Sequence, residues 1–365
     1  MSARTDTPIA LLQRLRETYH LPAAGLIEFS RAELATPLVA GVRRAGQTDP
    51  AGADDLWHFG SIGKAMTSAA IVALVAEGRI SLDTTIAEGL ADKLLRKPSA
   101  FARVTLRQLL SHRAGFRANP SLIRLMRYLA FGGDPPSVSA AMVTAALSGK
   151  PLYPPGDGFL YSNLGYGIAG LIGSRCARLS YPDLLQKRVL EPAGMATTAF
   201  GIVPQTGENP AEHRWSMLRR RYLPVTQDAR AVDDLPVMQP SGCVHGRLSD
   251  LARFGQFQLR AASADDPASQ AIRETHLPIG GPSQPGLPWR YGMGWIIEPD
   301  QPSGNLPIIW HNGSTGNSFA ALFLDRAGGC GLGFVSNAFS PVWGAPGSPL
   351  INELLAHSRL HPALA

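Results

Sequence analysis

Apolar residues near both ends of the chain follow the spacing of helices and strands. A helix is predicted close to the N-terminus, where apolar side chains recur at Ile9, Leu11, Leu12 and Leu15. The runs 22–31 and 37–45, separated by a polar turn, have the length and apolar content of two neighbouring antiparallel strands. Strand-like runs return towards the other end, at 291–298, 306–310, 318–324 and 331–336. A last helix is expected after Ser348, because a serine followed by proline is typical of a helix cap and first turn.

A long apolar helix is predicted from Ser61 to Gly78. Apolar residues occupy almost every side of this segment, and Gly78 is well placed as its C-terminal cap. A helix that is apolar all round is normally buried. Lys64, the one charged residue in its interior, is therefore expected to be buried with it.

The middle of the chain, from about 82 to 240, has a mainly helical pattern with long connections rich in Pro and Gly and few strand signals. A capping box of Thr105 and Gln108 predicts a short helix that ends before Gly115. Further helices are predicted at 138–148 and 164–179, and another opens at Ser249.

Strands near both termini, with helices between them, predict an α/β fold in which one antiparallel sheet is built from both ends of the chain and flanked by helices. A mainly helical region is inserted in the middle. The expected units are 1–81 with 241–365 for the sheet region and 82–240 for the helical region, together forming one catalytic unit.

Composition and charge exclude several classes of protein. The 365 residues are 45% hydrophobic and 17% charged, which is typical of a globular protein and not of a disordered or collagen-like chain. The net charge is +6, but the basic residues are scattered along the sequence. The one tight basic run, 219–221, lacks any nucleic-acid-binding signature and is interpreted as solvated surface. We therefore expect no nucleic-acid partner.

Three further features bear on location. No uncharged apolar run reaches the roughly 18 residues of a membrane span. The first residues also lack the apolar segment of an export signal. Cys176, Cys243 and Cys330 are odd in number and far apart, which indicates reduced, buried thiols and no disulfide framework. These features predict a cytoplasmic protein without a membrane span.

The strongest local signal for chemistry is the pair Ser61 and Lys64. Three residues apart on a helix, their side chains share one face. A serine hydroxyl needs a base to become a good nucleophile, and burial can lower the pKa of a lysine from about 10.4 into a useful range. The chain contains only five lysines, which makes this placement notable. The alternative is a helix cap beside a lysine whose charged end reaches solvent.

Two other segments carry side chains that suit catalysis. In 161–163, a tyrosine can serve as acid or base, and an asparagine can hold a substrate amide. In 311–314, expected at the end of a strand, a glycine allows a substrate to approach the backbone closely. Taken alone, the first means nothing and the second indicates only a turn.

In this order and at this separation, the three segments resemble the motif set of the serine β-lactamase and penicillin-binding-protein superfamily. The resemblance is to its class C (AmpC-like) branch, which includes family VIII-type esterases. Stretches at 104–115, 191–195 and 291–295 are also similar to that branch, so the resemblance extends over most of the chain.

The resemblance implies a role for each motif residue. Ser61 would be the acylated nucleophile, with Lys64 and Tyr161 sharing proton transfer. Asn163 would position the substrate and Lys64, and the backbone N–H groups of Ser61 and Ser314 would form an oxyanion hole. The remaining members of the implied binding site are His311, Asn312 and Gly313. His311 stands where many relatives have lysine, which weakens the expectation of carboxylate recognition, because histidine is largely neutral at pH 7.

Competing signatures are incomplete. Neither Ser61 nor Ser314 completes Gly-x-Ser-x-Gly, there is no His-Glu-x-x-His, and the glycine-rich 328–333 indicates a tight turn. The other histidines considered are expected to be structural or exposed, although two, His112 and His245, are candidates for lining the site. These residues are His58, His112, His213, His245 and His276.

The resemblance thus implies a serine hydrolase that cleaves a small-molecule ester or amide through an acyl-enzyme on Ser61, without metal or cofactor. An esterase or amidase is favoured by the expected compartment and by His311. An acyltransferase using the same acyl-serine, and a β-lactamase or D-alanyl-D-alanine carboxypeptidase, are alternatives. A non-enzymatic binding protein is disfavoured by the intact Ser61, Lys64 and Tyr161. The oligomeric state is not predicted.

Overall fold

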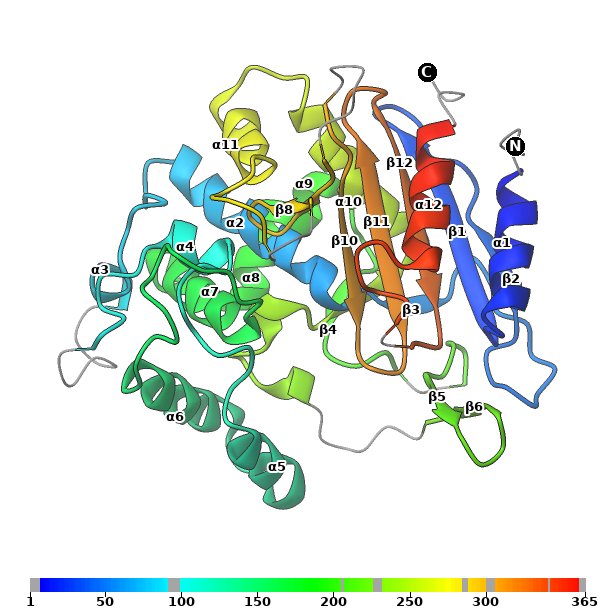
Figure 1. Cartoon of the computed structure of the whole chain (residues 1–365), viewed down its shortest axis with the longest axis horizontal. Coiled ribbons are helices and arrows are strands. Elements are labelled where there is room, and N and C mark those ends of the chain that lie inside the picture. The colour runs from blue at the N-terminus through cyan, green and yellow to red at the C-terminus, as the bar shows by residue number, and fades with distance from the viewer. Residues whose placement is uncertain are drawn as a thin grey trace.

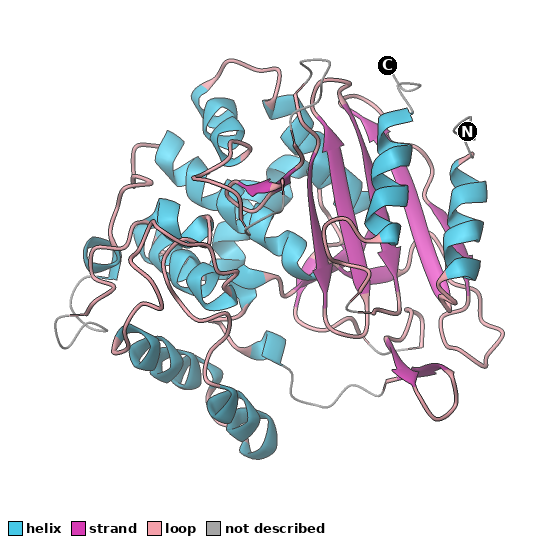
Figure 2. Ribbon diagram, in the orientation of Figure 1, coloured by secondary structure: helices cyan, strands magenta, loops and turns pink. Residues whose placement is uncertain are grey.

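A computed structural model describes residues 7–90, 99–204, 207–225, 232–283, 288–299, 306–340 and 342–360. Helices flank a central antiparallel sheet, and a further group of helices lies to one side of it (Figure 1, Figure 2). The predicted α/β fold, with its sheet built from both ends of the chain, is confirmed.

The helices of the described residues are α1 (Pro8–Thr18), α2 (Gly63–Ala76), α3 (Ile86–Leu90), α4 (Leu106–Leu110), α5 (Leu122–Phe131), α6 (Pro135–Leu147), α7 (Asn163–Ala177), α8 (Tyr181–Leu185), α9 (Glu191–Ala193), α10 (Leu248–Ala261), α11 (Pro267–Thr275) and α12 (Pro349–Leu360). Short helical turns are η1 (Gly60–Ile62), η2 (Gln186–Leu190), η3 (Val232–Asp234) and η4 (Gln239–Ser241). The strands are β1 (Ala23–Ser30), β2 (Leu38–Gly41), β3 (Leu56–His58), β4 (Ala199–Phe200), β5 (His213–Ser216), β6 (Arg221–Pro224), β7 (Val244–Arg247), β8 (Arg290–Tyr291), β9 (Ile296–Ile297), β10 (Ile309–Ser314), β11 (Phe319–Asp325) and β12 (Cys330–Ser336).

The main sheet joins the two ends of the chain. Within the described ranges its seven strands lie in the order β2-β1-β12-β11-β10-β9-β8, and each neighbouring pair is antiparallel. β1 pairs with β12 from Ala24 opposite Ser336 to Ser30 opposite Cys330. The predicted antiparallel pairing of the two N-terminal strands is confirmed by β1 and β2. The sheet therefore depends on contacts between segments about 300 residues apart.

Both faces of this sheet are buried. Along β11, Ala320, Leu322 and Leu324 belong to a core shared with α2 and α10. The alternate residues Phe319, Ala321 and Phe323 belong to a core shared with α1 and α12. Successive side chains of a strand point to opposite faces, so the apolar run predicts burial on both sides.

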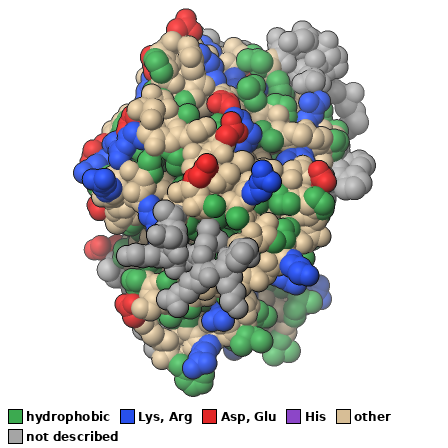
Figure 3. Space-filling model, turned by 90° about the vertical axis from the view of Figure 1, so that its left-hand side faces the viewer, with side chains coloured by type: hydrophobic (Ala, Val, Ile, Leu, Met, Phe, Trp, Pro, Cys, Tyr) green, Lys and Arg blue, Asp and Glu red, His purple; other side chains and the backbone are tan. Residues whose placement is uncertain are grey.

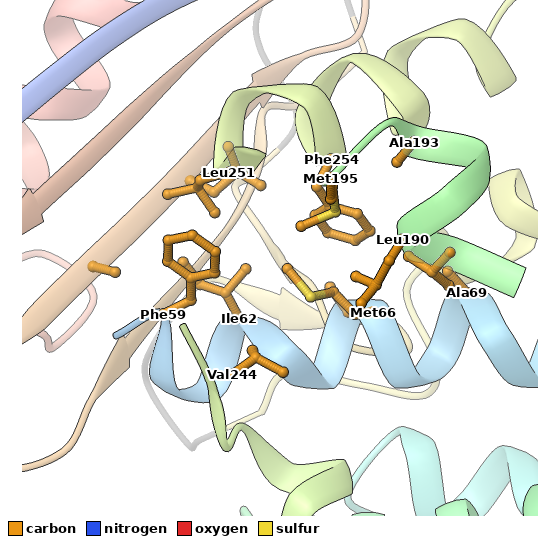
Figure 4. Close-up of a cluster of buried hydrophobic side chains, with 14 of the residues drawn as sticks. Phe59, Ile62, Met66, Ala69, Leu190, Ala193, Met195, Val244, Leu251 and Phe254 are labelled. Atoms are coloured by element: carbon orange, nitrogen blue, oxygen red, sulfur yellow. The ribbon is translucent and has the colours of Figure 1, made fainter. Parts of the chain in front are cut away.

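α2 runs through the interior between the sheet and the helical group. Figure 4 shows Ile62 and Met66 facing a cluster that includes Leu251 and Phe254 of α10. On another side, a Cβ placed on Gly63 would come within 2.8 Å of the Gly242 Cα. Lys64 is 0% exposed, as the apolar pattern predicted.

Several predicted boundaries differ from the structure. The α-helix begins at Gly63, because residues 60–62 form the tighter turn η1. The strand predicted at 306–310 is β10, which continues to Ser314 because its backbone pairs with β11. The run 291–298 is interrupted between β8 and β9, where Gly294 has a φ of +86°.

The middle region contains short strands that its sequence pattern did not indicate. These are β4, β5 and β6. β4 pairs with β7, whereas β5 and β6 form a separate hairpin. β4 has two residues and pairs with a strand about 45 residues away, whereas β5 and β6 pair locally but have only four residues each, too few for a clear alternation.

The cysteines are all unpaired. Cys243 and Cys330 are buried as predicted, but Cys176 is partly exposed, so the prediction of three buried thiols was wrong for this residue. Across the described ranges, no helix combines the length and the apolar character needed to span a bilayer.

Candidate active site

Hydrogen bonds with His58 fix the turn that carries Ser61. Gly60 has a φ of +53°, a conformation that favours glycine. Its N–H donates a 3.0 Å hydrogen bond to His58 Nδ1, and His58 Nε2 lies 2.8 Å from Asp233 Oδ2. Because Nδ1 accepts a hydrogen bond, the ring proton of neutral His58 is on Nε2 and is donated to Asp233. His58 thus has the structural role expected for it.

Lys64 lies directly behind Ser61. Its Nζ is 2.9 Å from Ser61 Oγ and 2.6 Å from the carbonyl oxygen of Ser241 in η4. It also lies 4.7 Å from the centre of the Tyr161 ring. The structure therefore brings together the three residues to which the sequence assigned proton transfer and nucleophilic attack. No ion pair of the described residues includes Lys64.

Burial shifts the pKa values of Lys64 and Tyr161 in opposite directions. It lowers the pKa of Lys64 from its usual 10.5 to about 7. It raises the pKa of Tyr161 well above the usual range, and the hydrogen bond of Tyr161 with Ser61 offsets only part of this effect. In both cases the charged form is disfavoured by loss of water. Near neutral pH, Lys64 is available as a proton acceptor while Tyr161 keeps its proton.

The backbone of β10 approaches the Ser61 turn very closely. A Cβ on Gly313 would lie 2.0 Å from the Phe59 carbonyl oxygen and 2.5 Å from the Ser61 nitrogen. A Cβ on Gly60 would lie 2.4 Å from the Ser314 nitrogen. Only glycine at both positions allows this approach. It brings the backbone nitrogens of Ser61 and Ser314 to the same part of the site, the arrangement that an oxyanion hole requires.

His311 is buried and neutral. Its Nδ1 is 2.6 Å from the Asn312 carbonyl oxygen, so this nitrogen carries the proton. Its Nε2, 3.0 Å from the Tyr291 hydroxyl, therefore accepts a hydrogen bond. Burial, with a smaller contribution from Lys64, lowers the pKa of His311 to about 3. The position does not supply the cation that a lysine would.

The side chain of Asn163 is hydrogen-bonded to the loop before α5. Its Nδ2 donates a 2.7 Å hydrogen bond to Asn119 Oδ1. The hydrogen bonds of Lys64 go to Ser61 and Ser241 instead. Among the described residues Asn163 and Lys64 thus have different hydrogen-bond partners, and the role of Asn163 in positioning the substrate stays a prediction.

A cleft of about 410 Å³ opens beside Ser61. Its walls are rich in aromatic side chains, contributed by Phe159, Tyr161, Trp289, Tyr291 and Phe339. His311, Asn312, Gly313 and Ser314 also line it. Among the described residues that line the cleft there is no lysine, arginine, aspartate or glutamate. A larger cavity of about 690 Å³ between α6, α7 and α8 contains none of the predicted site residues. The cleft is therefore the candidate active site because of the residues that line it and not because of its volume.

Asn312 helps to shape the cleft. Its Nδ2 donates a 2.6 Å hydrogen bond to the carbonyl oxygen of Gly344. This contact ties β10 to the segment before α12, which forms one wall of the cleft.

His112 packs against Tyr161 and is hydrogen-bonded to the next residue, Ser162. It has a φ of +61°, and its Nδ1 accepts a 2.9 Å hydrogen bond from the Ser162 N–H. Its ring centre is 4.3 Å from that of Tyr161, and burial holds the His112 pKa well below its usual value. His245 instead contacts the Gly201 carbonyl oxygen and does not line the cleft.

The sequence assigned no role to Tyr291, which donates to His311, to Ser241, whose carbonyl accepts from Lys64, or to the other aromatic walls of the cleft, Phe159, Trp289 and Phe339. The similarity of 291–295 to the class C branch was a signal for the tyrosine. The serine acts through its backbone, and a backbone contact leaves no signal in residue type. For metal binding, no group of three or more His, Cys, Asp or Glu side chains in the described ranges is arranged to hold an ion.

The comparison with known families agrees with this geometry. The β-lactamase family profile matches residues 9–355, and the chain belongs to that family. The fold and the family together define a serine hydrolase of the β-lactamase and penicillin-binding-protein type.

Individual relatives are distant. The chain is 24% identical over 333 residues to penicillin-binding protein 4 of Amycolatopsis lactamdurans, covering 88% of this chain and 82% of the relative. It is 26% identical over 279 residues to penicillin-binding protein 4* of Bacillus subtilis (strain 168), covering 72% of this chain and only 56% of that longer protein. The structure of the D-alanine carboxypeptidase AmpC from Burkholderia cenocepacia superposes with a TM-score of 0.71 and 19% identity, over 96% of each chain. A class C β-lactamase also shares the fold, with a TM-score of 0.72.

Proposed function

We propose that this protein is an esterase or amidase that carries the acyl group on Ser61 and prefers substrates without a carboxylate near the scissile bond. The observation that supports this preference is the aromatic cleft, whose described lining has no charged side chain and includes a neutral His311. β-Lactams and D-alanyl peptides carry a carboxylate, and binding it in such a cleft would desolvate the anion without a cationic partner among the described lining residues.

In the proposed acylation step, neutral Lys64 accepts the proton of Ser61 as Oγ bonds to the carbonyl carbon of the substrate. The developing oxyanion accepts hydrogen bonds from the N–H groups of Ser61 and Ser314. As the tetrahedral intermediate collapses, the bond to the leaving group breaks and Tyr161 donates its proton to that group. The proton on Lys64 then passes to Tyr161. The raised pKa keeps Tyr161 protonated, so that it has a proton to donate, and the lowered pKa of Lys64 leaves part of the lysine neutral near pH 7, so that it can accept one.

Deacylation uses water as the nucleophile and Lys64 as the base. Lys64 accepts a proton from water as the water oxygen bonds to the acyl carbon, and the bond to Ser61 breaks as Lys64 returns that proton to Oγ. The products are the free acid and the resting enzyme. An alcohol or amine in place of water would make the same protein an acyltransferase.

The first experiment compares the reaction of the protein with neutral p-nitrophenyl esters and, separately, with a β-lactam. We expect turnover of the esters, a mass increase of the intact protein equal to the acyl group, and weak reaction with the β-lactam. Ser61→Ala should abolish both the turnover and the adduct. The matched control is Ser148→Ala, at an exposed serine after α6, which should behave as wild type. An adduct on another residue would contradict the site, and preferential turnover of the β-lactam would contradict the substrate class.

A second experiment separates hydrolysis from transfer. Added alcohols or amines should not divert the acyl group if the protein is a hydrolase. Accumulation of transfer products at the expense of free acid would instead support the acyltransferase. We also propose a cytoplasmic location, which is supported by the three unpaired cysteines.

A further inference from the structure

Helix α5 presents an apolar face to solvent. Leu122, Ile123 and Met126 are 71%, 80% and 57% exposed, and Phe131 at its end is 82% exposed. The helix is nevertheless anchored, because Tyr128 is buried on the opposite side in the core of the helical group. Contiguous exposed apolar side chains on an ordered helix are a common mark of an interaction surface.

A second apolar projection occurs at the tip of the β5–β6 hairpin. Met217 and Leu218 are 82% and 93% exposed there. The base of the hairpin is held in place, since the His213 N–H donates to the Asn317 carbonyl oxygen and Ser318 Oγ donates to Glu212 Oε1. The hairpin is therefore held at its base while its apolar tip is exposed to solvent.

Each projection is connected to the candidate site through residues adjacent to it in sequence. α5 follows a loop in which Asn119 accepts a hydrogen bond from Asn163, close in sequence to Tyr161. The base of the hairpin contacts 317–318, which follow directly after the cleft residue Ser314. In Figure 1, α5 and the β5–β6 hairpin both project at the lower edge of the molecule.

Basic residues accompany both projections. The segments 117–133 and 213–224 contain seven arginines and no acidic residue. The rest of the chain then holds 27 basic against 28 acidic residues, so the positive net charge of the protein resides in these two segments. The seven are Arg117, Arg124, Arg127, Arg214, Arg219, Arg220 and Arg221, all exposed and absent from the ion pairs of the described residues.

Two carboxylates border these segments and only partly offset the arginines. Asp134 accepts hydrogen bonds from Ser137 at the N-terminus of α6, and Glu212 accepts one from Ser318, so seven arginines stand against two acidic residues. Figure 3 shows hydrophobic and basic side chains together at the lower end of the molecule. The fold places the two basic segments at the same edge of the molecule (Figure 1).

We propose that α5 and the β5–β6 hairpin form a surface that docks the mouth of the cleft on an anionic lipid bilayer. Apolar side chains flanked by arginines match the two layers of a membrane interface, because the side chains enter the acyl boundary while the guanidinium groups meet lipid phosphates. The charge argues for a bilayer over a second copy of this chain, since two copies meeting through this face would oppose arginine to arginine. The surface would bring Ser61 to substrates that partition into membranes.

The test measures sedimentation of the full chain with vesicles of phosphatidylcholine alone and with about a third phosphatidylglycerol. We expect binding only to the anionic vesicles, and loss of binding at high salt. Arg219→Gln/Arg220→Gln/Arg221→Gln should weaken binding about a hundredfold, at roughly 1 kcal/mol for each arginine. Ile123→Ser/Phe131→Ser should weaken it at least about tenfold.

Matched controls carry the same changes at exposed positions elsewhere. These are Arg103→Gln/Arg178→Gln/Arg260→Gln and Leu277→Ser/Leu306→Ser. Turnover of a water-soluble ester should be unchanged in all variants, which also shows that they fold. No binding of the wild type to anionic vesicles, or equal losses in the controls, would overturn the proposal. Concentration-dependent self-association lost only in the surface variants would assign this face to a second copy. The vesicle assay needs no substrate, so its result is independent of the proposed function.

Discussion

Replacing Lys64 with Met is expected to stabilise the protein while removing its activity. Lys64 is fully buried and its Nζ bonds to Ser61 Oγ and the Ser241 carbonyl oxygen. Methionine has a similar length and no charge to desolvate. The substitution loses two hydrogen bonds, about 2 kcal/mol in all. It also removes the unfavourable effect of burying an amine whose pKa falls from 10.5 to about 7.

That unfavourable effect depends on pH. Between pH 7 and 10.5 the unfolded chain keeps Lys64 protonated while the folded protein has released the proton, so wild-type stability rises with pH in this window. At about 1.4 kcal/mol per pH unit, the destabilisation is about 4 kcal/mol at pH 7 and about 2 kcal/mol at pH 9. Lys64→Met should therefore gain about 2 kcal/mol at pH 7 and close to nothing at pH 9.

Urea unfolding of wild type and Lys64→Met at pH 7 and pH 9 measures how the difference in their free energies of unfolding changes with pH. Other titrating groups largely cancel, because they are present in both proteins. Lys187→Met, at an exposed lysine of η2, is the control and should show no such pH dependence. A Lys64→Met gain that is equal at pH 7 and pH 9, or a loss of stability at pH 7, would refute the argument that burial lowers the lysine pKa.

Three further outcomes follow from the site. Ester hydrolysis by the wild type should rise about tenfold in kcat/KM from pH 6 to 8, with its midpoint near the Lys64 pKa of about 7; a flat profile would contradict Lys64 as the base. Gly313→Ala, whose Cβ would lie 2.0 Å from the Phe59 carbonyl oxygen, should lower kcat by at least about a hundredfold. Gly281→Ala, with nothing within 4 Å of its Cβ, should stay near wild type, and equal effects of the two would argue against the close approach. His311→Lys should raise kcat/KM for a carboxylate-bearing substrate relative to a neutral ester; an unchanged ratio would show that this position does not set the preference.

Local pattern was enough to predict much of the site. Ser61 and Lys64 are three residues apart in an apolar helix, so their shared face and the burial of the lysine follow from helical spacing alone. The antiparallel sheet could also be predicted, because its strands read as apolar runs near both termini. Motif resemblance placed Tyr161 and 311–314 beside the same nucleophile, and all of them line the cleft.

Predictions failed where a distant segment decides the outcome. Asn163 is hydrogen-bonded to Asn119, a contact with another loop that a motif read in isolation does not reveal. The first turn of the helix is tighter than expected, because the nucleophile segment is pressed between β10 and Gly242. The third motif lies within a strand because β11 extends the pairing to Ser314.

The sequence by itself determined which chemical groups are present, their spacing within each element, and the apolar character that buries α2. Only the tertiary structure decided how those groups are charged and what they face. The lowered pKa of Lys64, the neutral state of His311 and the uncharged lining of the cleft arise from exclusion of water by segments far apart in the chain. The same packing places the arginine-bearing segments 117–133 and 213–224 at one edge of the molecule. Solvation and electrostatic potential depend on distances in space, and the fold sets those distances.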